Sequence, residues 1–398
     1  MNSLQMLADD SVHEASGTHT GRAKIAWLSP FPPQRSGIAN YSYWLIKALS
    51  AELDIDLFSN EQLTPELAAN FVVRPLSAFP ARFRDYDDVI YHLGNHAVFH
   101  KRIYELAWQH PATIVLHDYN LSGFMREAFY PQHLYRQAML RVQLKHNEVS
   151  ERQAAMSHAI VDRSRKVIVH HRWARNQFAD HPRVEVIPHF ARINYTPTEL
   201  DIARFKQQFE LRSDHFVITC LGFVNLNKLP ALQIDVVKRL LGEGYPVHLV
   251  FAGEPAPDVL DLLIKSKLDG YSKNVICTGY LNERDYFSAI FASDVIINLR
   301  NPTMGESSGT LAHALAAGRP TIVSNVNQYR EFPDTVCWKI DHGKDKAELL
   351  FQYLTALLSE RNLRTRMSAN ATDFTSRVLS LEKVAAQWLQ LIFKGLNQ

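Results

Sequence analysis

The chain has 398 residues, of which 46% are apolar, so it is too long for one ordinary core and about two domains are expected. Its formal net charge of +2 argues against the broad basic field of a nucleic-acid-binding protein, and we expect no nucleic-acid partner. Three cysteines, Cys220, Cys277 and Cys337, lie far apart and form neither a disulfide framework nor a zinc pattern, which fits a reducing compartment.

The amino-terminal residues 1–22 are polar and lack the apolar core of a signal peptide, so we expect a disordered leader. No apolar run approaches the roughly 20 residues that cross a bilayer. We therefore expect a cytoplasmic protein. A weak peripheral contact with the inner face of the membrane stays open, because a local basic patch can touch anionic lipid.

The first half of the chain alternates between short apolar runs and a helical pattern at 39–53. Strands are predicted at 24–29, 54–59, 88–94, 112–118, 166–171 and 184–189. Continuous apolar strands between amphipathic helices are typical of a parallel, doubly wound sheet.

After a polar connector and a helix at 190–215, the same pattern starts again. Further strands are predicted at 216–223, 247–253, 274–280, 294–300 and 320–325, and the spacing of apolar residues over 370–393 predicts a packing helix. The fold class is therefore α/β, with two doubly wound parallel-sheet domains.

Polar residues follow strand after strand in both halves. The segments are "SPFPPQRSGIANYS", "HLGNHAVFH", "HD", "GFVNLNK" and "RNPTMGESSG". Because ligands of open parallel sheets bind beyond the carboxyl ends of the strands, we expect these segments to form one site.

The segment "NLRNPTMGESSGTLAHALAAGRPTIVSN" at 298–325 places a glycine-punctuated turn before an alanine-rich helix. Two interpretations compete. Ser307 or Ser308 caps the helix while Glu306 complements its positive end, or the free N–H groups there bind an anion.

Other positions likewise have one structural and one ligand-binding interpretation. Gly37 either makes a turn or lets a phosphate approach the backbone, and Lys228 is either solvated or paired with an anion at a helix start. His117 is either held by its neighbour Asp118 or faces the ligand as a neutral donor and acceptor. A histidine-rich turn at 92–100 has spacing unsuited to one helical face, so no metal is expected.

This ordered series, covering roughly 24–395, resembles family 4 retaining glycosyltransferases with the GT-B fold. The motifs are "LSPFPPQRSGIANYSYWLIKAL", "LHD" and "VIPHF" in the first half, and "GFVNLNK", "FAGEP" and "GESSGTLAHALAAGRPTIVSN" in the second. The resemblance implies two Rossmann-like domains facing across a cleft. The implied division is a leader at 1–22, an acceptor-side domain at 23–195, a nucleotide-sugar-binding domain at 196–375, and a helix at 376–398 that crosses back.

The resemblance also implies roles for particular residues, with no cofactor besides the nucleoside-diphosphate sugar and no metal. His117, Glu306, Lys228 and Arg300 are the candidate catalytic residues. The donor candidates are Gly37, Asn225, Tyr280, Leu281, Ser307, Ser308, Gly309, Thr310 and His313. The acceptor candidates are Asn95, His96 and Asp118.

The chain departs from the family pattern in two places. Phe223 stands where an arginine commonly follows the glycine of the lysine motif, and Arg300 is our candidate replacement because its planar fork suits phosphate. His313 falls where the second glutamate of the E-x7-E motif usually holds ribose, and the spacing from Glu306 is one residue short.

The function implied is a retaining, metal-independent hexosyltransferase that acts on a saccharide or lipid-linked saccharide. Analogy with transferases that build bacterial surface polysaccharides favours GDP-mannose as donor, that is, a mannosyltransferase. Two alternatives stay open: an enzyme that acts on the nucleotide sugar itself, such as an epimerase, and a catalytically silent nucleotide-sugar-binding protein.

Overall fold

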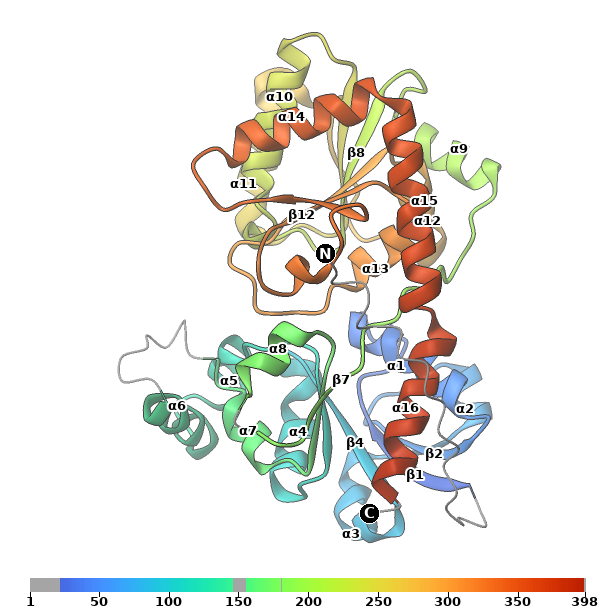
Figure 1. Cartoon of the computed structure of the whole chain (residues 1–398), viewed down its shortest axis with the longest axis vertical. Helices are drawn as coiled ribbons and strands as arrows, with labels where there is room; N and C mark the ends of the chain where they lie inside the picture. The colour runs from blue at the N-terminus through green and yellow to red at the C-terminus, as the bar shows by residue number, and fades with distance from the viewer. Residues whose placement is uncertain (1–21, 146–154, 180, 397–398) are drawn as a thin grey trace, which may run out of the picture.

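The computed structural model describes residues 22–145, 155–179 and 181–396. The predicted leader, apart from its last residue, lies outside the described residues. The described chain forms two parallel sheets, each flanked by helices and stacked end to end (Figure 1), so the predicted α/β class with two doubly wound sheets is confirmed.

The first sheet has seven strands in the order β3-β2-β1-β4-β5-β6-β7. Their bounds are β1 Ala23–Leu28, β2 Leu53–Phe58, β3 Val72–Arg74, β4 Asp88–Leu93, β5 Thr113–Leu116, β6 Lys166–Val169 and β7 Val184–Val186. The helices around it are α1 Gly37–Leu49, α2 Pro65–Asn70, α3 Phe79–Arg82, α4 Ala97–Gln109, α5 Ser122–Phe129, α6 His133–Lys145, α7 His158–Arg163 and α8 Arg172–Gln177, with 3-10 turns η1 Leu76–Ala78 and η2 Phe83–Asp85.

The second sheet has six strands in the order β10-β9-β8-β11-β12-β13. Their bounds are β8 Phe216–Leu221, β9 Val247–Ala252, β10 Val275–Cys277, β11 Val295–Asn298, β12 Thr321–Ser324 and β13 Cys337–Ile340. The remaining helices are α9 Glu199–Gln208, α10 Pro230–Gly242, α11 Pro257–Ser266, α12 Glu283–Ala292, α13 Gly309–Ala316, α14 Lys346–Ser359, α15 Arg361–Val378 and α16 Leu381–Leu396, with short turns η3 Leu226–Lys228, η4 Lys267–Tyr271 and η5 Asn327–Glu331.

Local sequence explains where several of these helices begin. The side chain of Ser36 accepts a hydrogen bond from the Ile38 N–H and caps α1, and Thr198 with Asp201 forms a capping box on α9. Proline opens α10 and α11 at a position that needs no N–H donor.

The structure differs from the sequence predictions at the end of one helix and at two strands. The helix predicted at 39–53 ends at Leu49, because β2 already begins at Leu53. The strands β3 and β13 were not predicted. Each has only three or four residues and lies at a sheet edge, where one neighbour suffices and the sequence pattern is short.

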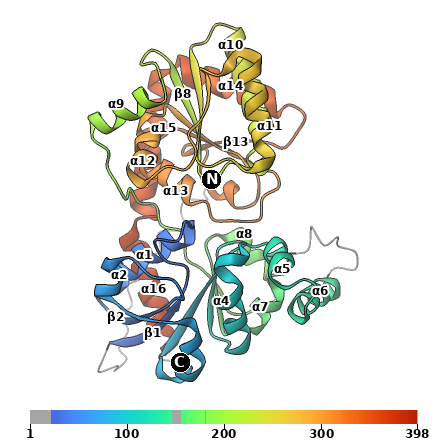
Figure 2. The same ribbon diagram turned by 180° about the vertical axis from the view of Figure 1, so that it is seen from behind.

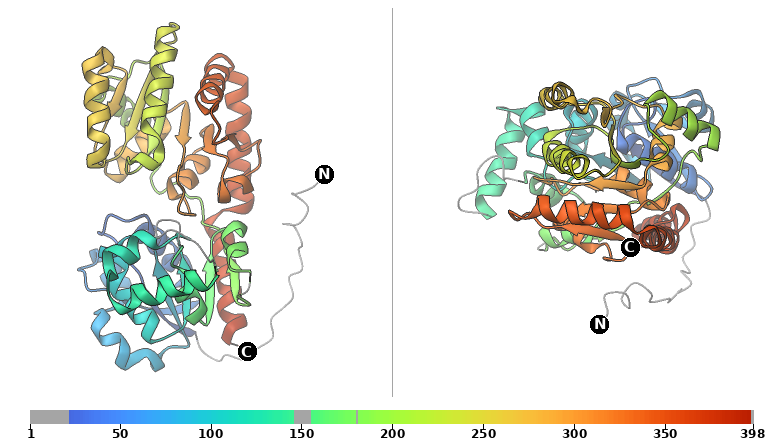
Figure 3. Two further views of the ribbon diagram at one scale, coloured as in Figure 1. Left: turned by 90° about the vertical axis from the view of Figure 1, so that its left-hand side faces the viewer. Right: turned by 90° about the horizontal axis from the view of Figure 1, so that it is seen from above.

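The helix predicted over 370–393 is in fact two helices, α15 and α16, broken at residues 379–380. At the break the carbonyl of Leu379 accepts a hydrogen bond of 2.7 Å from the N–H of Ala191, which belongs to the connector between the sheets. The two segments that pass between the units, the connector and the break between α15 and α16, are thus hydrogen-bonded to each other. Figure 3 shows α15 and α16 running along one side of both units.

The two carboxyl-terminal helices pack on different units. α15 contacts α13 beside the second sheet, whereas α16 contacts α1 beside the first. Trp388 of α16 is fully buried against Trp27 of β1, and its Nε1 donates to the hydroxyl of Tyr41 at 3.3 Å. The predicted boundary between 375 and 376 falls inside α15, and the predicted domain limits stay a proposal.

No helix in the described ranges is both long enough and apolar enough to span a membrane. Cys220, Cys277 and Cys337 are free thiols, and Cys220 and Cys337 are buried.

Candidate functional site

The carboxyl edge of the second sheet brings Gly222, Lys228 and the start of α13 together. A Cβ atom added at Gly222 would lie 2.9 Å from Thr310 Cγ2 and 3.5 Å from Lys228 Nζ. Gly222 also has a φ of +75°, a conformation that glycine adopts without strain. The lysine motif after β8 and the donor segment after β11 therefore meet at one point, as the sequence predicts for the ends of parallel strands.

Lys228 is buried, with 4% of its surface exposed. Its ammonium donates to the carbonyl of Leu221, and desolvation lowers the pKa of Lys228 to about 7. A nearby anion would raise the pKa of Lys228 again.

The start of helix α13 has both the serine cap and the free N–H groups that the sequence analysis gave as alternatives. Ser308 Oγ accepts a hydrogen bond from the N–H of Leu311 at 3.3 Å, so a serine does cap the helix. The predicted donor residues Gly309 and Thr310 form its first turn, where backbone N–H groups remain available. Capping and anion binding are therefore compatible here.

Asn298, the last residue of β11, is a polar residue of this site that the sequence analysis did not single out. It is 3% exposed, its Oδ1 lies 3.4 Å from Ser308 Oγ, and its Nδ2 makes no hydrogen bond with the described residues. Ser307 Oγ and Asn225 Oδ1 are likewise buried without a partner in the described part of the chain. The position of Asn298 at a strand's carboxyl end was the available signal.

Arg300 and Glu306 form an ion pair, with Arg300 Nε 3.0 Å from Glu306 Oε1 and both side chains largely buried. Glu306 also accepts hydrogen bonds of 2.8 Å from the Thr303 hydroxyl and from the N–H of Met304. The charge of Arg300, predicted to replace a missing phosphate-binding arginine, is thus balanced inside its own loop. The sequence could not show this, because residues six apart in a loop have no fixed separation.

The His117 side chain differs from its predicted direction. Its Nε2 lies 2.9 Å from His92 Nδ1 and its Nδ1 lies 3.1 Å from His170 Nε2, so both ring nitrogens are engaged inside the first unit. Burial lowers the pKa of all three histidines, in His170 to about 3. The ring therefore faces inward and is neutral.

A chain of neutral histidines requires one tautomer in each ring. His170 Nδ1 lies 2.9 Å from the carbonyl oxygen of Ile187 and must donate to it, which leaves His170 Nε2 as an acceptor for His117 Nδ1–H. His117 Nε2 then accepts from His92 Nδ1–H. The buried Nε2 of His92 has no partner among the described residues.

Asp118, the neighbour of His117, lies beyond the carboxyl end of β5 and pairs through its backbone with Glu306. Its Oδ2 accepts a 2.8 Å hydrogen bond from the N–H of Asn95, and burial raises its carboxyl pKa to about 7. Two acceptor candidates, Asn95 and Asp118, are thus adjacent. The third, His96, is exposed, and its ring lies tilted against that of Phe99.

The remaining donor candidates lie around this centre. Gly37 is exposed at the start of α1, and a Cβ atom added to it would have nothing within 4 Å. Tyr280 is 55% exposed and lies under the Arg35 guanidinium, 4.0 Å from its ring centroid. Leu281 packs as a partly buried side chain against the core of the second unit.

His313, predicted near the ribose, has its Nδ1 3.1 Å from the Tyr286 hydroxyl of α12. Burial lowers its pKa to about 3. The ring is neutral, and one of its two nitrogens is already engaged within the second unit. Tyr286 and Phe287 of α12 both contact the His313 ring.

The two units join through backbone hydrogen bonds between residues 117–120 and residues 304–307, which we call the domain junction. The N–H of Ser307 donates to the carbonyl of His117 at 3.1 Å, and the N–H of Asn120 donates to that of Met304 at 2.8 Å. Across the same junction, Glu331 accepts from the N–H groups of Arg172 and Trp173 at the start of α8. Figure 2 shows α8, α1 and α13 between the two sheets.

Gly305 lies at the centre of the junction with a φ of +66°. A Cβ atom there would lie 2.6 Å from the Trp173 ring and 2.7 Å from Tyr119 Cβ. His171 Nε2 is 3.2 Å from the Gly305 carbonyl oxygen. Only a residue without a side chain fits this contact.

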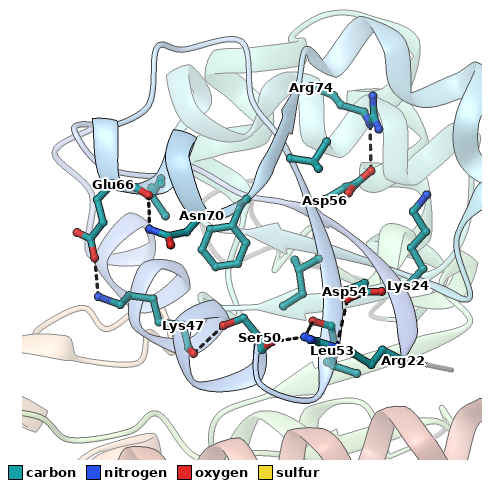
Figure 4. Close-up of a pocket in the computed structure, with 14 residues that line it drawn as sticks. Arg22, Lys24, Lys47, Ser50, Leu53, Asp54, Asp56, Glu66, Asn70 and Arg74 are labelled. Atoms are coloured by element: carbon teal, nitrogen blue, oxygen red, sulfur yellow. Dashed lines mark hydrogen bonds and ion pairs between the residues drawn. The ribbon is translucent and has the colours of Figure 1, made fainter.

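A separate hollow of about 790 Å³ lies at the amino ends of β1 and β2, away from the junction (Figure 4). Six of its seven charged side chains are paired with one another, Arg22 with Asp54, Lys47 with Glu66, and Arg74 with Asp56, and the seventh, Lys24, lies over the Tyr86 ring. Because these pairs are satisfied and the strands' carboxyl ends lie elsewhere, we do not place the site here. Among the described residues, no group of three histidine, cysteine or acidic side chains is arranged to hold a metal ion.

Comparisons with known proteins agree with the fold. Residues 201–374, less than half of the chain, match the family model of group 1 glycosyl transferases. No curated protein sequence gives a significant match.

Solved structures match nearly the whole chain. HepE from Anabaena in complex with UDP-glucose has 14% identity and a TM-score of 0.69, over 94% of this chain and 100% of its own. Sucrose-phosphate synthase from Thermosynechococcus elongatus has 16% identity and a TM-score of 0.68, over 94% and 99%. WaaG, a glycosyltransferase involved in lipopolysaccharide biosynthesis, has 14% identity and a TM-score of 0.59, over 92% and 99%. The chain has the GT-B fold, and its second unit carries the group 1 glycosyl transferase signature.

Proposed function

We propose that the protein is a glycosyltransferase that moves a hexosyl group from a nucleoside-diphosphate sugar to a saccharide or lipid-linked saccharide. The observation that carries the proposal is the meeting of Gly222, Lys228 and the first turn of α13, inside the segment that matches the group 1 model. This meeting point supplies a lysine and free backbone N–H groups, which suit a diphosphate.

Lys228 and the α13 amides would stabilise the leaving group. When the bond between the anomeric carbon and the phosphate oxygen breaks, its electron pair stays on that oxygen, and fixed cations and N–H donors lower the barrier. The acceptor oxygen forms the new bond on the same face, and its proton passes to the departing phosphate oxygen. This retaining course is part of the proposal and needs no metal ion.

Arg300 and Glu306 would act together. Arg300 and the Tyr329 hydroxyl engage Glu306 Oε1, and Thr303 and Met304 donate to Oε2, so Glu306 would fix the shape of the donor loop. Arg300 then contributes through Glu306 and not as a free phosphate cation.

His117 would position the site and not touch the sugar with its ring. Its ring is held by His92 and His170, and its carbonyl accepts the Ser307 N–H across the junction. Asp118 and Asn95, on the same edge, are our candidates for the acceptor hydroxyl. An acid with a pKa near 7 can also exchange a proton at neutral pH.

Two donors are the first to test. The sequence resemblance favours GDP-mannose, whereas the HepE structure of the same fold holds UDP-glucose. A cytoplasmic enzyme in surface-polysaccharide synthesis, working beside the inner face of the membrane, is the setting that we propose.

The test is release of UDP or GDP from each donor, with and without an oligosaccharide acceptor. We expect acceptor-dependent release that survives EDTA, and NMR of the new linkage should show the donor's anomeric configuration. Conversion of the donor sugar without an acceptor would favour the epimerase alternative. Donor binding with no turnover for any acceptor would favour a silent binding protein.

A further inference from the structure

The positive charge available to a diphosphate at the candidate site is smaller than the sequence suggests. Arg300 is balanced by Glu306, and Phe223, 55% exposed after β8, carries no charge. Lys228 is buried beside α13, and burial holds its pKa near 7. A nucleoside diphosphate would leave with more negative charge than Lys228 alone can balance.

Arg35 is an uncommitted cation on the opposite unit. It lies in the loop between β1 and α1 and is exposed, and its guanidinium makes no hydrogen bond or ion pair with any described residue. The guanidinium lies over the ring of Tyr280, 4.0 Å away in the second unit. A guanidinium on an exposed ring is held only weakly, so a stronger partner can take it.

The backbone around Arg35 is fixed although its side chain is free. The N–H of Gln34 donates to the Phe31 carbonyl at 3.0 Å, and the N–H of Ser36 donates to the Gln34 carbonyl at 2.9 Å. Ser36 then caps α1, and Gly37 leaves open space above the helix start. The loop therefore presents one long cationic side chain next to an accessible helix N-terminus.

We propose that Arg35 is a second phosphate-binding residue of the donor site, which leaves Tyr280 and pairs with the diphosphate when the donor binds. The inference rests on the proposed function. It assigns to the first unit a charge of the donor site, and it makes donor binding dependent on both units.

The experiment compares the full-length protein with Arg35→Met, which keeps the length of the side chain without its charge. Arg35→Lys keeps the charge. Arg163→Met is the matched control, because Arg163 also lies over an aromatic ring, that of Trp108 at 4.7 Å, but on α7 of the first unit. The probes are UDP and GDP, titrated by calorimetry at low and at high salt, and melting temperatures check that each variant folds.

We expect Arg35→Met to lower the affinity for the diphosphate by about 10- to 100-fold at low salt, as loss of a charge-assisted contact does. At high salt the decrease in affinity should be smaller. Arg35→Lys should recover part of the loss, and Arg163→Met should bind like the wild type. Wild-type affinity in Arg35→Met, or a loss that salt does not reduce, would overturn the assignment while leaving the proposed function intact. A wild-type protein that binds neither nucleotide would overturn both.

Discussion

The carboxyl edges of the two sheets are built in opposite ways. At the first edge, His92, His117 and His170 satisfy one another in a neutral chain. At the second, Lys228 is buried beside free helix amides, and Asn298 Nδ2 has no partner among the described residues. At the first edge the described rings leave one buried acceptor, His92 Nε2, without a partner, whereas the second edge keeps unsatisfied donors. The contrast suggests that the second edge binds the anionic ligand and the first edge holds it in place.

The largest test of this contrast is Lys228→Ala. Loss of a buried charge-assisted contact to the leaving group should cost roughly 2–4 kcal/mol of transition-state stabilisation. This corresponds to a decrease in kcat/KM of about 30- to 1000-fold. Steady-state kinetics measures it. Lys238→Ala is the control, because Lys238 pairs with Asp269 on the outer face of α10.

The lowered pKa of Lys228 also predicts that diphosphate binding is coupled to proton uptake. Because its pKa is lowered to about 7 and an anion would raise it, diphosphate binding above pH 7 should take up a proton. Calorimetry in buffers of different ionisation enthalpy would detect the uptake, and Lys228→Ala should abolish it. Equal binding enthalpy in all buffers would contradict a charged role for Lys228.

The next test breaks the ion pair of the donor loop. Glu306→Gln leaves the Arg300 charge largely buried and unpaired, so we expect the free energy of unfolding to fall by about 1–3 kcal/mol. Urea denaturation measures it. The Arg300→Met, Glu306→Gln double variant should lose less than the two single variants together, and strict additivity would mean that the pair contributes nothing.

A third test introduces a steric clash at the domain junction between the two edges. Gly305→Ala adds a Cβ that would clash with Trp173 and Tyr119, and we expect about 1–3 kcal/mol of destabilisation with reduced turnover. Gly244→Ala is the matched control, since it has a φ of +86° and open space around it. A loss equal in both variants would reflect backbone strain alone.

The smallest test concerns the neutral histidine chain. The pKa of His170 is depressed to about 3, so its stabilising contribution is full above its unfolded value near 6.5 and is lost as the pH falls towards 3. His170→Leu should therefore reduce the slope of stability against pH by up to about 1.4 kcal/mol per pH unit between these values. An unchanged slope would show that His170 is not kept neutral by the fold.

The sequence by itself determined the α/β class, the two parallel sheets and the segments that form the site. Apolar runs such as residues 216–221 and 247–252 give strands wherever they are buried, and parallel strands bring their carboxyl ends to one edge. Gly222, Lys228 and Thr310 could be grouped for that reason before any contact was known.

Only the tertiary structure decided which charges and rings are free. Arg300 is committed to Glu306, the His117 ring turns towards His92 and His170, and Arg35 reaches across to Tyr280. The break between α15 and α16 depends likewise on a hydrogen bond between Ala191 and Leu379, far apart in the chain. Periodicity fixes the face of an element, but side-chain direction within loops and pairing across domains depend on long-range contacts that no local pattern encodes.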